Sequence, residues 1–215
     1  MLLTLLFTGD VLGALYYALA ILPAIMFHEL SHAYAAYLCG DTTAKQYGRI
    51  SFNPLKHLDL IGTIMILLVG FGWAKPVPIN PRMFKNFKLG TVIVSLAGPV
   101  SNFLLAFAAL LILTPIYRQE FALIIPFFIY LIIINIGLGV FNLIPIPPLD
   151  GSKILFALLP RSAYEFVLTY ERYGFIILIA LLYFMGGVLS VGRENVYNLL
   201  HYLASMILPN VPRIM

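Results

Sequence analysis

A motif of the form H-E-x-x-H occupies residues 28–32, within a long apolar segment that runs from residue 11 to residue 38. Residues four apart lie on the same face of a helix, so His28 and His32 can both reach one metal ion. Glu29 lies beside them, where it can act as a general base on a metal-bound water. Because the surrounding segment is almost uncharged, the motif predicts a metal site inside a membrane-spanning helix.

The composition is typical of a chain that is embedded in a membrane. Of its 215 residues, 61% are hydrophobic and only 10% are charged, whereas a soluble domain carries about 25% charged residues. Each membrane-spanning helix needs roughly 20 apolar residues. We therefore expect an all-α multi-pass membrane protein with five to six transmembrane or re-entrant helices, organised as one membrane-embedded domain over residues 1–215. The net charge of +4 comes from loop residues and gives no sign of nucleic-acid binding.

Four stretches are long and apolar enough to be predicted spans: Val11–Leu38, Thr91–Leu113, Phe121–Ile144 and Gly174–Val191. Leu60–Gly72 is apolar but too short for a comfortable crossing, so we expect a re-entrant or broken segment there. Gly151–Leu159 is predicted to be a short helix, and Glu194–Leu208 an amphipathic tail helix. The alternating polarity of Gln46–Phe52 predicts a short β-strand in the loop after the first span.

The distribution of basic residues predicts how the chain is oriented in the membrane. Residues 41–90 contain seven Lys or Arg residues, whereas the loop between the second and third spans contains only Arg118. The positive-inside rule therefore places residues 41–90 in the cytoplasm. His32 lies about eight residues before this loop, which puts the metal on the order of 10 Å inside the cytoplasmic face. We expect a multi-pass protein of the cell membrane with its site near that face.

A third protein ligand is needed, because catalytic zinc ions are held by three side chains and a water. The other acidic and histidine candidates are Asp10, Asp59, Asp150, His57 and His201. Asp150 is favoured because it follows a proline-rich stretch at the end of a span, where an ionisable group is costly unless paired or bound to metal. The prolines bend the chain and Gly151 allows a turn, so the carboxylate can point back into the bundle. His57 and Asp59 are better interpreted as organising the loop.

Five short segments carry a family resemblance: HELSH at 28–32, NPLKHLD at 53–59, AKPVP at 74–78, AGPVSN at 97–102 and NLIPIPPLDG at 142–151. In combination they resemble the site-2 protease family of intramembrane zinc metalloproteases. The resemblance implies that zinc is bound by His28, His32 and Asp150. It also implies that Glu29 is the general base and that Asn142 helps to hold the substrate or the developing oxyanion. Without PDZ-like or CBS-like segments, the chain resembles the minimal branch of that family.

The resemblance also implies a reaction and its partners. The reaction is hydrolysis of peptide bonds in or near transmembrane segments of membrane proteins, with Zn2+ as cofactor. The expected partners are a transmembrane protein substrate and the lipid bilayer, not nucleic acid. The amides of Asn142 or Asn102 could donate hydrogen bonds to the oxyanion, although either could instead serve helix packing. A strand edge near Gln46–Phe52 could capture an unwound substrate.

Two other functions are compatible with the same ligands. One is a non-catalytic membrane protein that keeps the metal for structure or for partner binding, and the other is a metal transporter. Glu29 argues against the first, because a purely structural site has no need of a general base. The single compact ligand set argues against the second, because the chain offers no further series of intramembrane His, Asp or Glu. We therefore expect a zinc endopeptidase.

Overall fold

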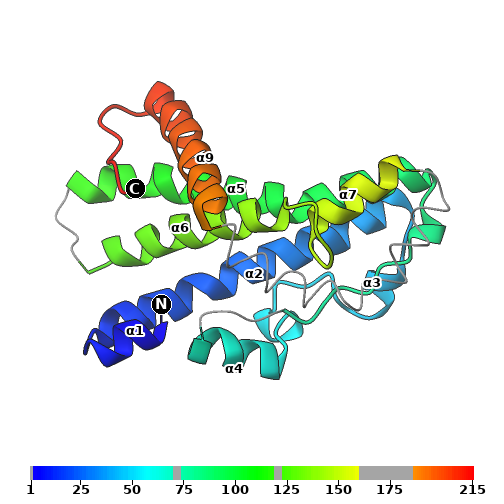
Figure 1. Ribbon diagram of the computed structural model, residues 1–215, viewed down its shortest axis with the longest axis horizontal. Helices are drawn as coiled ribbons and strands as arrows, with labels where there is room; N and C mark the ends of the chain where they lie inside the picture. The colour runs from blue at the N-terminus through cyan, green and yellow to red at the C-terminus, as the bar shows by residue number, and fades with distance from the viewer. Residues whose placement is uncertain (1, 70–73, 119–122, 160–185) are drawn as a thin grey trace.

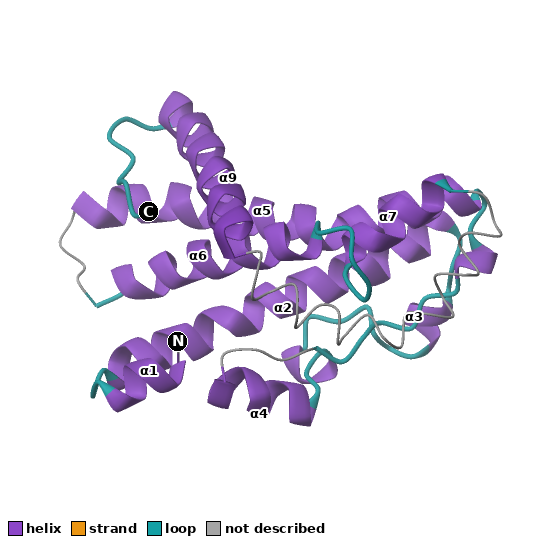
Figure 2. Ribbon diagram, viewed as in Figure 1, coloured by secondary structure: helices purple, strands orange, loops and turns teal. Residues whose placement is uncertain are grey.

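The computed structural model describes residues 2–69, 74–118, 123–159 and 186–215. Within these ranges every regular element is a helix (Figure 2). The only β pairing in the same ranges is an isolated antiparallel bridge between Leu58 and Ala74. The expected all-α architecture is therefore confirmed for the described residues.

Three long helices lie side by side and form the body of the molecule (Figure 1). They are α2 (Val11–Cys39), α5 (Phe87–Arg118) and α6 (Ile125–Asn142). Each contains a stretch that is long and apolar enough to cross a membrane. Even the shortest of them, α6, is about 27 Å long, which approaches the thickness of the hydrocarbon core.

Small side chains let these helices approach one another closely. Ala20 and Ala24 on α2, and Ala106 and Ala109 on α5, are at most 2% exposed. Helices in lipid gain little from hydrophobic burial against each other, so close backbone contact and dispersion hold them together instead. Larger residues of α5 and α6 fill the remaining core, namely Leu110, Leu113, Leu131, Ile132 and Ile136. This packing fixes the frame on which the site is built.

Capping residues set the two ends of α2. The Asp10 carboxylate accepts a hydrogen bond of 2.8 Å from a backbone N–H in the first turn, which satisfies one of the donors that a helix start leaves unpaired. Gly40 ends the helix with a φ of 112°, in the left-handed region that glycine adopts without strain. Asp41 follows, and its buried carboxylate accepts the N–H groups of Thr43 at 2.9 Å and Asn80 at 2.6 Å. Asp41 therefore ties the loop region to the end of α2.

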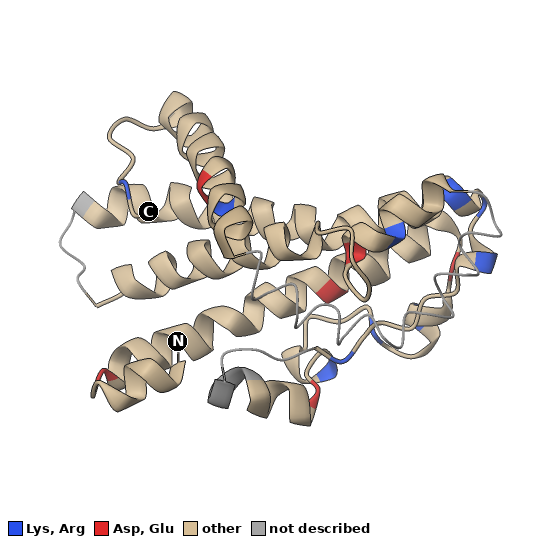
Figure 3. Ribbon diagram, viewed as in Figure 1, with Lys and Arg blue, Asp and Glu red and all other residues tan. Residues whose placement is uncertain are grey.

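Shorter elements surround the three long helices. They are α1 (Leu2–Phe7), α3 (Thr43–Gln46), the 3₁₀ turn η1 (Pro54–Lys56), α4 (Leu60–Val69), the 3₁₀ turn η2 (Pro81–Met83), α7 (Asp150–Leu158) and α9 (Gly186–Ile207). The short helix expected before residue 159 and the tail helix are thus confirmed as α7 and α9. Helix α7 packs along α5, and α9 crosses α5 and α6. Many of the Lys and Arg residues gather around α3 and the first turn of α5 (Figure 3).

The prediction of a strand at Gln46–Phe52 is wrong. The first of these residues ends α3, and the chain turns at Gly48, which has a φ of +64°. The Arg49 N–H then donates to the Ala44 carbonyl at 2.8 Å. Backbone groups that a strand would pair with a neighbour are used here to close the end of a helix.

The expected count of five to six membrane helices is not confirmed by the described residues. The described residues contain three candidate spans. The span expected at residues 174–191 lies largely outside the described residues, and the rest of it, from residue 186, belongs to α9. The re-entrant candidate corresponds to α4, whose ten residues are fewer than a crossing requires.

Candidate active site

His28 and His32 lie one turn apart on α2, and their rings meet edge to face with centroids 4.6 Å apart. Their Nε2 atoms are 3.0 Å apart. Asp150, the first residue of α7, brings its Oδ2 atom to 3.0 Å from His32 Nε2 and 3.2 Å from His28 Nε2. All three residues are buried. The fold therefore brings together the three ligands that the sequence suggests.

The three converging atoms are all hydrogen-bond acceptors. A carbonyl oxygen can only accept, so the His32 Nδ1–H donates to the Val94 carbonyl, 2.7 Å away. His28 Nδ1 likewise lies 2.7 Å from the Asn102 amide oxygen. With the proton on Nδ1, each neutral imidazole turns the lone pair of Nε2 towards the Asp150 carboxylate. Three such atoms repel one another unless a cation lies between them.

Zinc suits this donor set. A tetrahedral zinc ion with ligands at about 2.0–2.1 Å holds its ligand atoms about 3.3 Å apart. The separations of 3.0–3.2 Å between Nε2 and Oδ2 atoms are close to that requirement. Two imidazoles and one carboxylate leave a fourth position for water or substrate, as catalytic zinc sites do.

The charge state of Asp150 also suits a metal ligand. Burial raises the pKa of its carboxyl, whereas the nearby Lys153 ammonium lowers it. Lys153 Nζ lies 3.2 Å from the second carboxylate oxygen, Oδ1. This ammonium favours the ionised form of Asp150, which is the form that binds a metal.

Two glycines make room for the cluster. A Cβ atom at Gly98 of α5 would lie 2.4 Å from His32 Nε2. A Cβ atom at Gly151 would lie 2.2 Å from the Leu143 carbonyl oxygen, so only glycine lets α7 begin against the end of α6. This close approach places Asp150, at the start of α7, next to His28 and His32.

Glu29 faces a loop segment rather than another helix. Its Oε2 atom accepts a hydrogen bond of 3.2 Å from the Val77 backbone N–H. Val77 lies between Pro76 and Pro78, which have no N–H, so it provides the only backbone donor of that tripeptide. One backbone group therefore sets the direction of the Glu29 carboxylate.

Arg49 holds the same loop segment from its other end. Its guanidinium donates to the Lys75 carbonyl, and the Lys75 N–H donates to the His57 carbonyl at 2.9 Å. Arg49 is only 7% exposed. Burial lowers the pKa of its guanidinium, and the negative charge of Glu29 offsets part of this effect. His57 is fully buried in the loop region, and its ring also bonds to the Ser51 carbonyl at 2.7 Å.

The two asparagines singled out in the sequence occupy unlike positions. Asn102 is fully buried, and its Nδ2 donates to the Ala24 carbonyl at 3.0 Å and to the Asn135 amide oxygen at 2.8 Å. Both of its N–H groups are used inside the bundle, so the oxyanion role considered for Asn102 does not match its geometry. Asn142 is half-buried at the end of α6, where one N–H donates to the Leu138 carbonyl at 3.0 Å.

Sequence reasoning missed three contributors to the site: Asn135, Val94 and Val77. Asn135 did leave a signal, because an amide in the middle of an apolar span has to find a partner. Val94 and Val77 act through a backbone carbonyl and a backbone N–H. Every residue except proline has both groups, so no side chain could have pointed to them.

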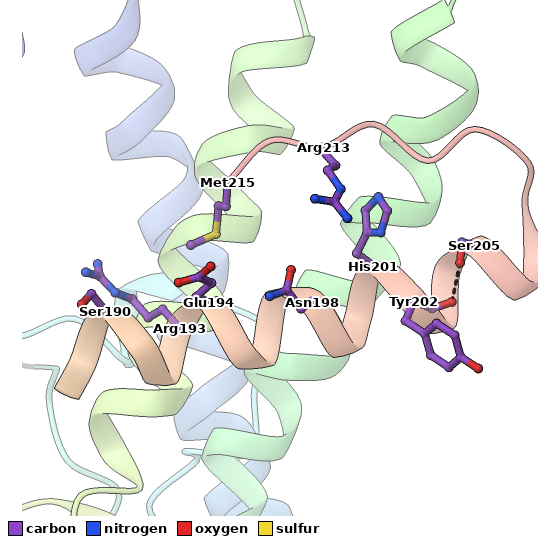
Figure 4. A pocket seen from close by; sticks show the side chains of 9 residues that line it. All are labelled: Ser190, Arg193, Glu194, Asn198, His201, Tyr202, Ser205, Arg213 and Met215. Carbon is purple, nitrogen blue, oxygen red and sulfur yellow. Dashed lines mark hydrogen bonds between the residues drawn. The ribbon is translucent and has the colours of Figure 1, made fainter. Parts of the chain in front are cut away.

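A separate open cleft of about 800 Å³ runs along the polar face of α9 (Figure 4). It is lined by Ser190, Arg193, Glu194, Asn198, His201, Tyr202, Ser205, Arg213 and Met215. His201 Nε2 lies 3.2 Å from the Val211 carbonyl. None of the lining residues belongs to the metal cluster, so His201 is not a ligand candidate for that cluster.

Comparisons with known proteins point to the same chemistry. The model of Peptidase family M50 matches residues 114–185. A Bacillus subtilis protein named "Putative zinc metalloprotease YwhC" is 43% identical over 206 residues, which cover 86% of this chain and 94% of that protein. A Mycolicibacterium smegmatis protein named "Putative zinc metalloprotease Rip2" is 29% identical over 75% of this chain and 64% of that protein. No solved structure matches the chain.

Proposed function

Since this chain belongs to peptidase family M50, the site-2 protease family, we propose that its zinc ion is bound by His28, His32 and Asp150. The chain is an integral membrane protein and an intramembrane zinc metalloprotease, as the sequence predicts. Glu29 is the proposed general base. The observation that carries the ligand assignment is the convergence of three buried acceptor atoms within 3.2 Å of one another.

The ligands and the base divide the chemistry between them. When bound, the zinc ion acts as a Lewis acid that polarises the scissile carbonyl and lowers the pKa of water. His28 and His32 present their Nε2 atoms, because each ring is held through its Nδ1–H. Glu29, next to His28 on α2, accepts a proton from the attacking water and transfers it to the leaving amine.

The remaining polar groups take separate roles in this proposal. Asn142 lies just before the turn that carries Asp150, and its amide is the proposed donor to the substrate or to the oxyanion. Asn102 orients His28 instead, since its oxygen faces His28 Nδ1. The Val77 N–H orients Glu29.

The substrate is proposed to be a transmembrane segment of another membrane protein. The ligands lie on or beside helices that are apolar enough to span a membrane, so a substrate in the same bilayer can reach them. A helical segment bonds its own amides internally, so it must be unwound before a peptide bond is cut. The substrate segment therefore needs residues that favour local unwinding.

The placement in the cell is also part of the proposal. The seven basic residues of the 41–90 region support a cytoplasmic location for it, and we assign the active site to the cytoplasmic side of the cell membrane. Residues 1–215 are proposed to form one peptidase domain. Five to six membrane or re-entrant helices stay a prediction.

A cleavage assay with matched metal analysis tests this function. Glu29→Gln should retain zinc and lose cleavage of a transmembrane substrate in lipid vesicles, because it removes the base but no ligand. Asp150→Asn should lose cleavage and also bind less zinc, because an amide is a poorer ligand than a carboxylate.

The matched control is Glu194→Gln, which makes the same change at an exposed position of α9. It should behave like the wild type in both measurements. Full activity of Glu29→Gln would overturn the mechanism. A wild type that binds zinc but cuts no membrane protein would favour the non-catalytic alternative.

A further inference from the structure

Two buried amides connect α6 to a metal ligand on α2. Asn135 of α6 and Asn102 of α5 are both fully buried. The Asn102 Nδ2 lies 2.8 Å from the Asn135 oxygen, and the Asn102 oxygen lies 2.7 Å from His28 Nδ1. A continuous row of hydrogen bonds thus runs across three helices and ends on the ring that faces the metal cluster.

The direction of each hydrogen bond in this row is fixed by backbone carbonyls at its ends. The Asn135 Nδ2 lies 2.7 Å from the Leu131 carbonyl, which can only accept, so the Asn135 oxygen must face Asn102. The Asn102 Nδ2 lies 3.0 Å from the Ala24 carbonyl as well as next to the Asn135 oxygen. Both acceptors require N–H groups on that side, so the Asn102 oxygen must face His28.

The fixed direction selects one tautomer of His28. An amide oxygen that faces Nδ1 accepts a hydrogen bond from Nδ1–H, which leaves the lone pair on Nε2. This is the tautomer that can bind a metal through Nε2, and Nε2 is the atom that points at Asp150. We infer that Asn135 is a positioning residue, which holds His28 in its metal-binding tautomer through Asn102. The inference rests on the proposed function, because it takes His28 to be a zinc ligand.

Loss of the Asn135 oxygen would weaken this selection. One N–H of Asn102 would then be buried without a partner, and only the Ala24 carbonyl would oppose a flip of the amide. A flipped amide would present N–H groups to His28 Nδ1 and favour the tautomer with its proton on Nε2. Losing an outer hydrogen-bond partner of a metal ligand typically weakens metal binding by about 10- to 100-fold.

The first test compares two substitutions of one residue. Asn135→Leu keeps the branching and the number of heavy atoms of the side chain but removes the acceptor. Its zinc dissociation constant should rise, by up to the about 10- to 100-fold expected when the partner of the ligand itself is lost. Asn135→Asp in its protonated form donates its O–H to the Leu131 carbonyl and keeps an oxygen that accepts from Asn102, so it should restore most of the affinity. Zinc affinity is measured by chelator competition on the full chain in lipid nanodiscs.

A matched control removes another buried polar group. The Thr114 hydroxyl donates to the Leu110 carbonyl at 2.8 Å within α5 and has no part in the row. Thr114→Val should leave zinc affinity unchanged. Equal affinity in Asn135→Leu and Thr114→Val would overturn the inference, as would an equal loss in Asn135→Leu and Asn135→Asp.

Nitrogen NMR of the metal-free protein, labelled in histidine, reads the tautomer directly. The wild type and Asn135→Asp should carry the His28 proton on Nδ1, and Asn135→Leu should show a population with the proton on Nε2. A merely structural role of Asn135 would not move this signal. An unchanged tautomer in Asn135→Leu would overturn the inference.

A double-mutant cycle tests whether Asn135 affects zinc binding through Asn102 or independently of it. Asn102→Ala already breaks the link to His28, so adding Asn135→Leu should cause no further loss of zinc affinity. Additive losses would overturn the inference. If His28→Ala leaves zinc binding unchanged, the proposed ligand set is wrong, and the inference about Asn135 is wrong with it. If His28→Ala abolishes binding while Asn135→Leu does not weaken it, only the role of Asn135 fails.

Discussion

Neighbouring residues of α2 are held in different ways on the two sides of that helix. His28 and His32 face α5, and each is fixed by a hydrogen bond of 2.7 Å to a partner on α5. Glu29 faces a loop and is fixed by a bond of 3.2 Å from Val77. Partners inside a packed bundle cannot move without repacking the core, whereas loop contacts open at lower cost.

This difference explains how a rigid site can admit a substrate. The proposed metal ligands need constant geometry, and they lie on the bundle side. Glu29, the proposed base, would contact both a water and a leaving group, and it faces the loop, whose contacts open at lower cost. Changes on the bundle side should therefore alter zinc binding, and changes on the loop side should alter only turnover.

The largest expected effect is on the bundle side, at Gly98. In Gly98→Ala the added Cβ would lie 2.4 Å from His32 Nε2, so either the ring or α5 must shift. Overpacking of this kind should weaken zinc binding by about 100-fold and abolish cleavage. Gly187→Ala is the matched control, because its Cβ would meet nothing within 4 Å. Normal zinc affinity in Gly98→Ala would contradict the expectation that tight packing on the bundle side fixes His32.

An intermediate effect is expected on the loop side. Val77→Pro deletes the N–H that holds Glu29. Because this hydrogen bond is made to a charged group, its loss should lower turnover by about tenfold. Zinc content, measured on the same samples, should stay at the wild-type level. Val77→Ala keeps the N–H and should cleave normally. If Val77→Pro lost zinc, the two sides of α2 would not be independent.

The smallest effect is expected at Lys153, at the edge of the site. Its ammonium lies 3.2 Å from Asp150 Oδ1, but its side chain is 47% exposed. Ion pairs of this kind contribute little, so Lys153→Met should change zinc affinity by less than about fivefold. Isothermal titration of the metal-free protein can measure this. A much larger change would mean that Lys153 belongs to the bundle-side framework.

Features that depend on side-chain pattern could be predicted from the sequence. The long apolar segments are typical of spans, and α2, α5 and α6 lie within a few residues of three predicted ones. Asp150 could be found because an ionisable group beside a span needs a partner. The fold does bring it to 3.0 Å from His32.

Features that depend on which helices meet could not be predicted. Asn102 lies in a recognisable motif, but no pattern shows that its donors face Ala24 and Asn135. The strand at Gln46–Phe52 rested on alternation over a few residues, and a turn at Gly48 outweighed it. Val77 contributes only a backbone N–H, which leaves no trace in a sequence.

The distance between the ligands along the chain has a consequence for folding. His32 and Asp150 are 118 residues apart in sequence, and the proposed zinc ion between them would close that entire loop. The binding energy is gained only when α2 and α7 are assembled, so it contributes to the stability of the assembled bundle. The proposed zinc ion would thus stabilise the fold as well as take part in catalysis. A cell that withholds zinc would inactivate the enzyme and loosen α7 in the same event.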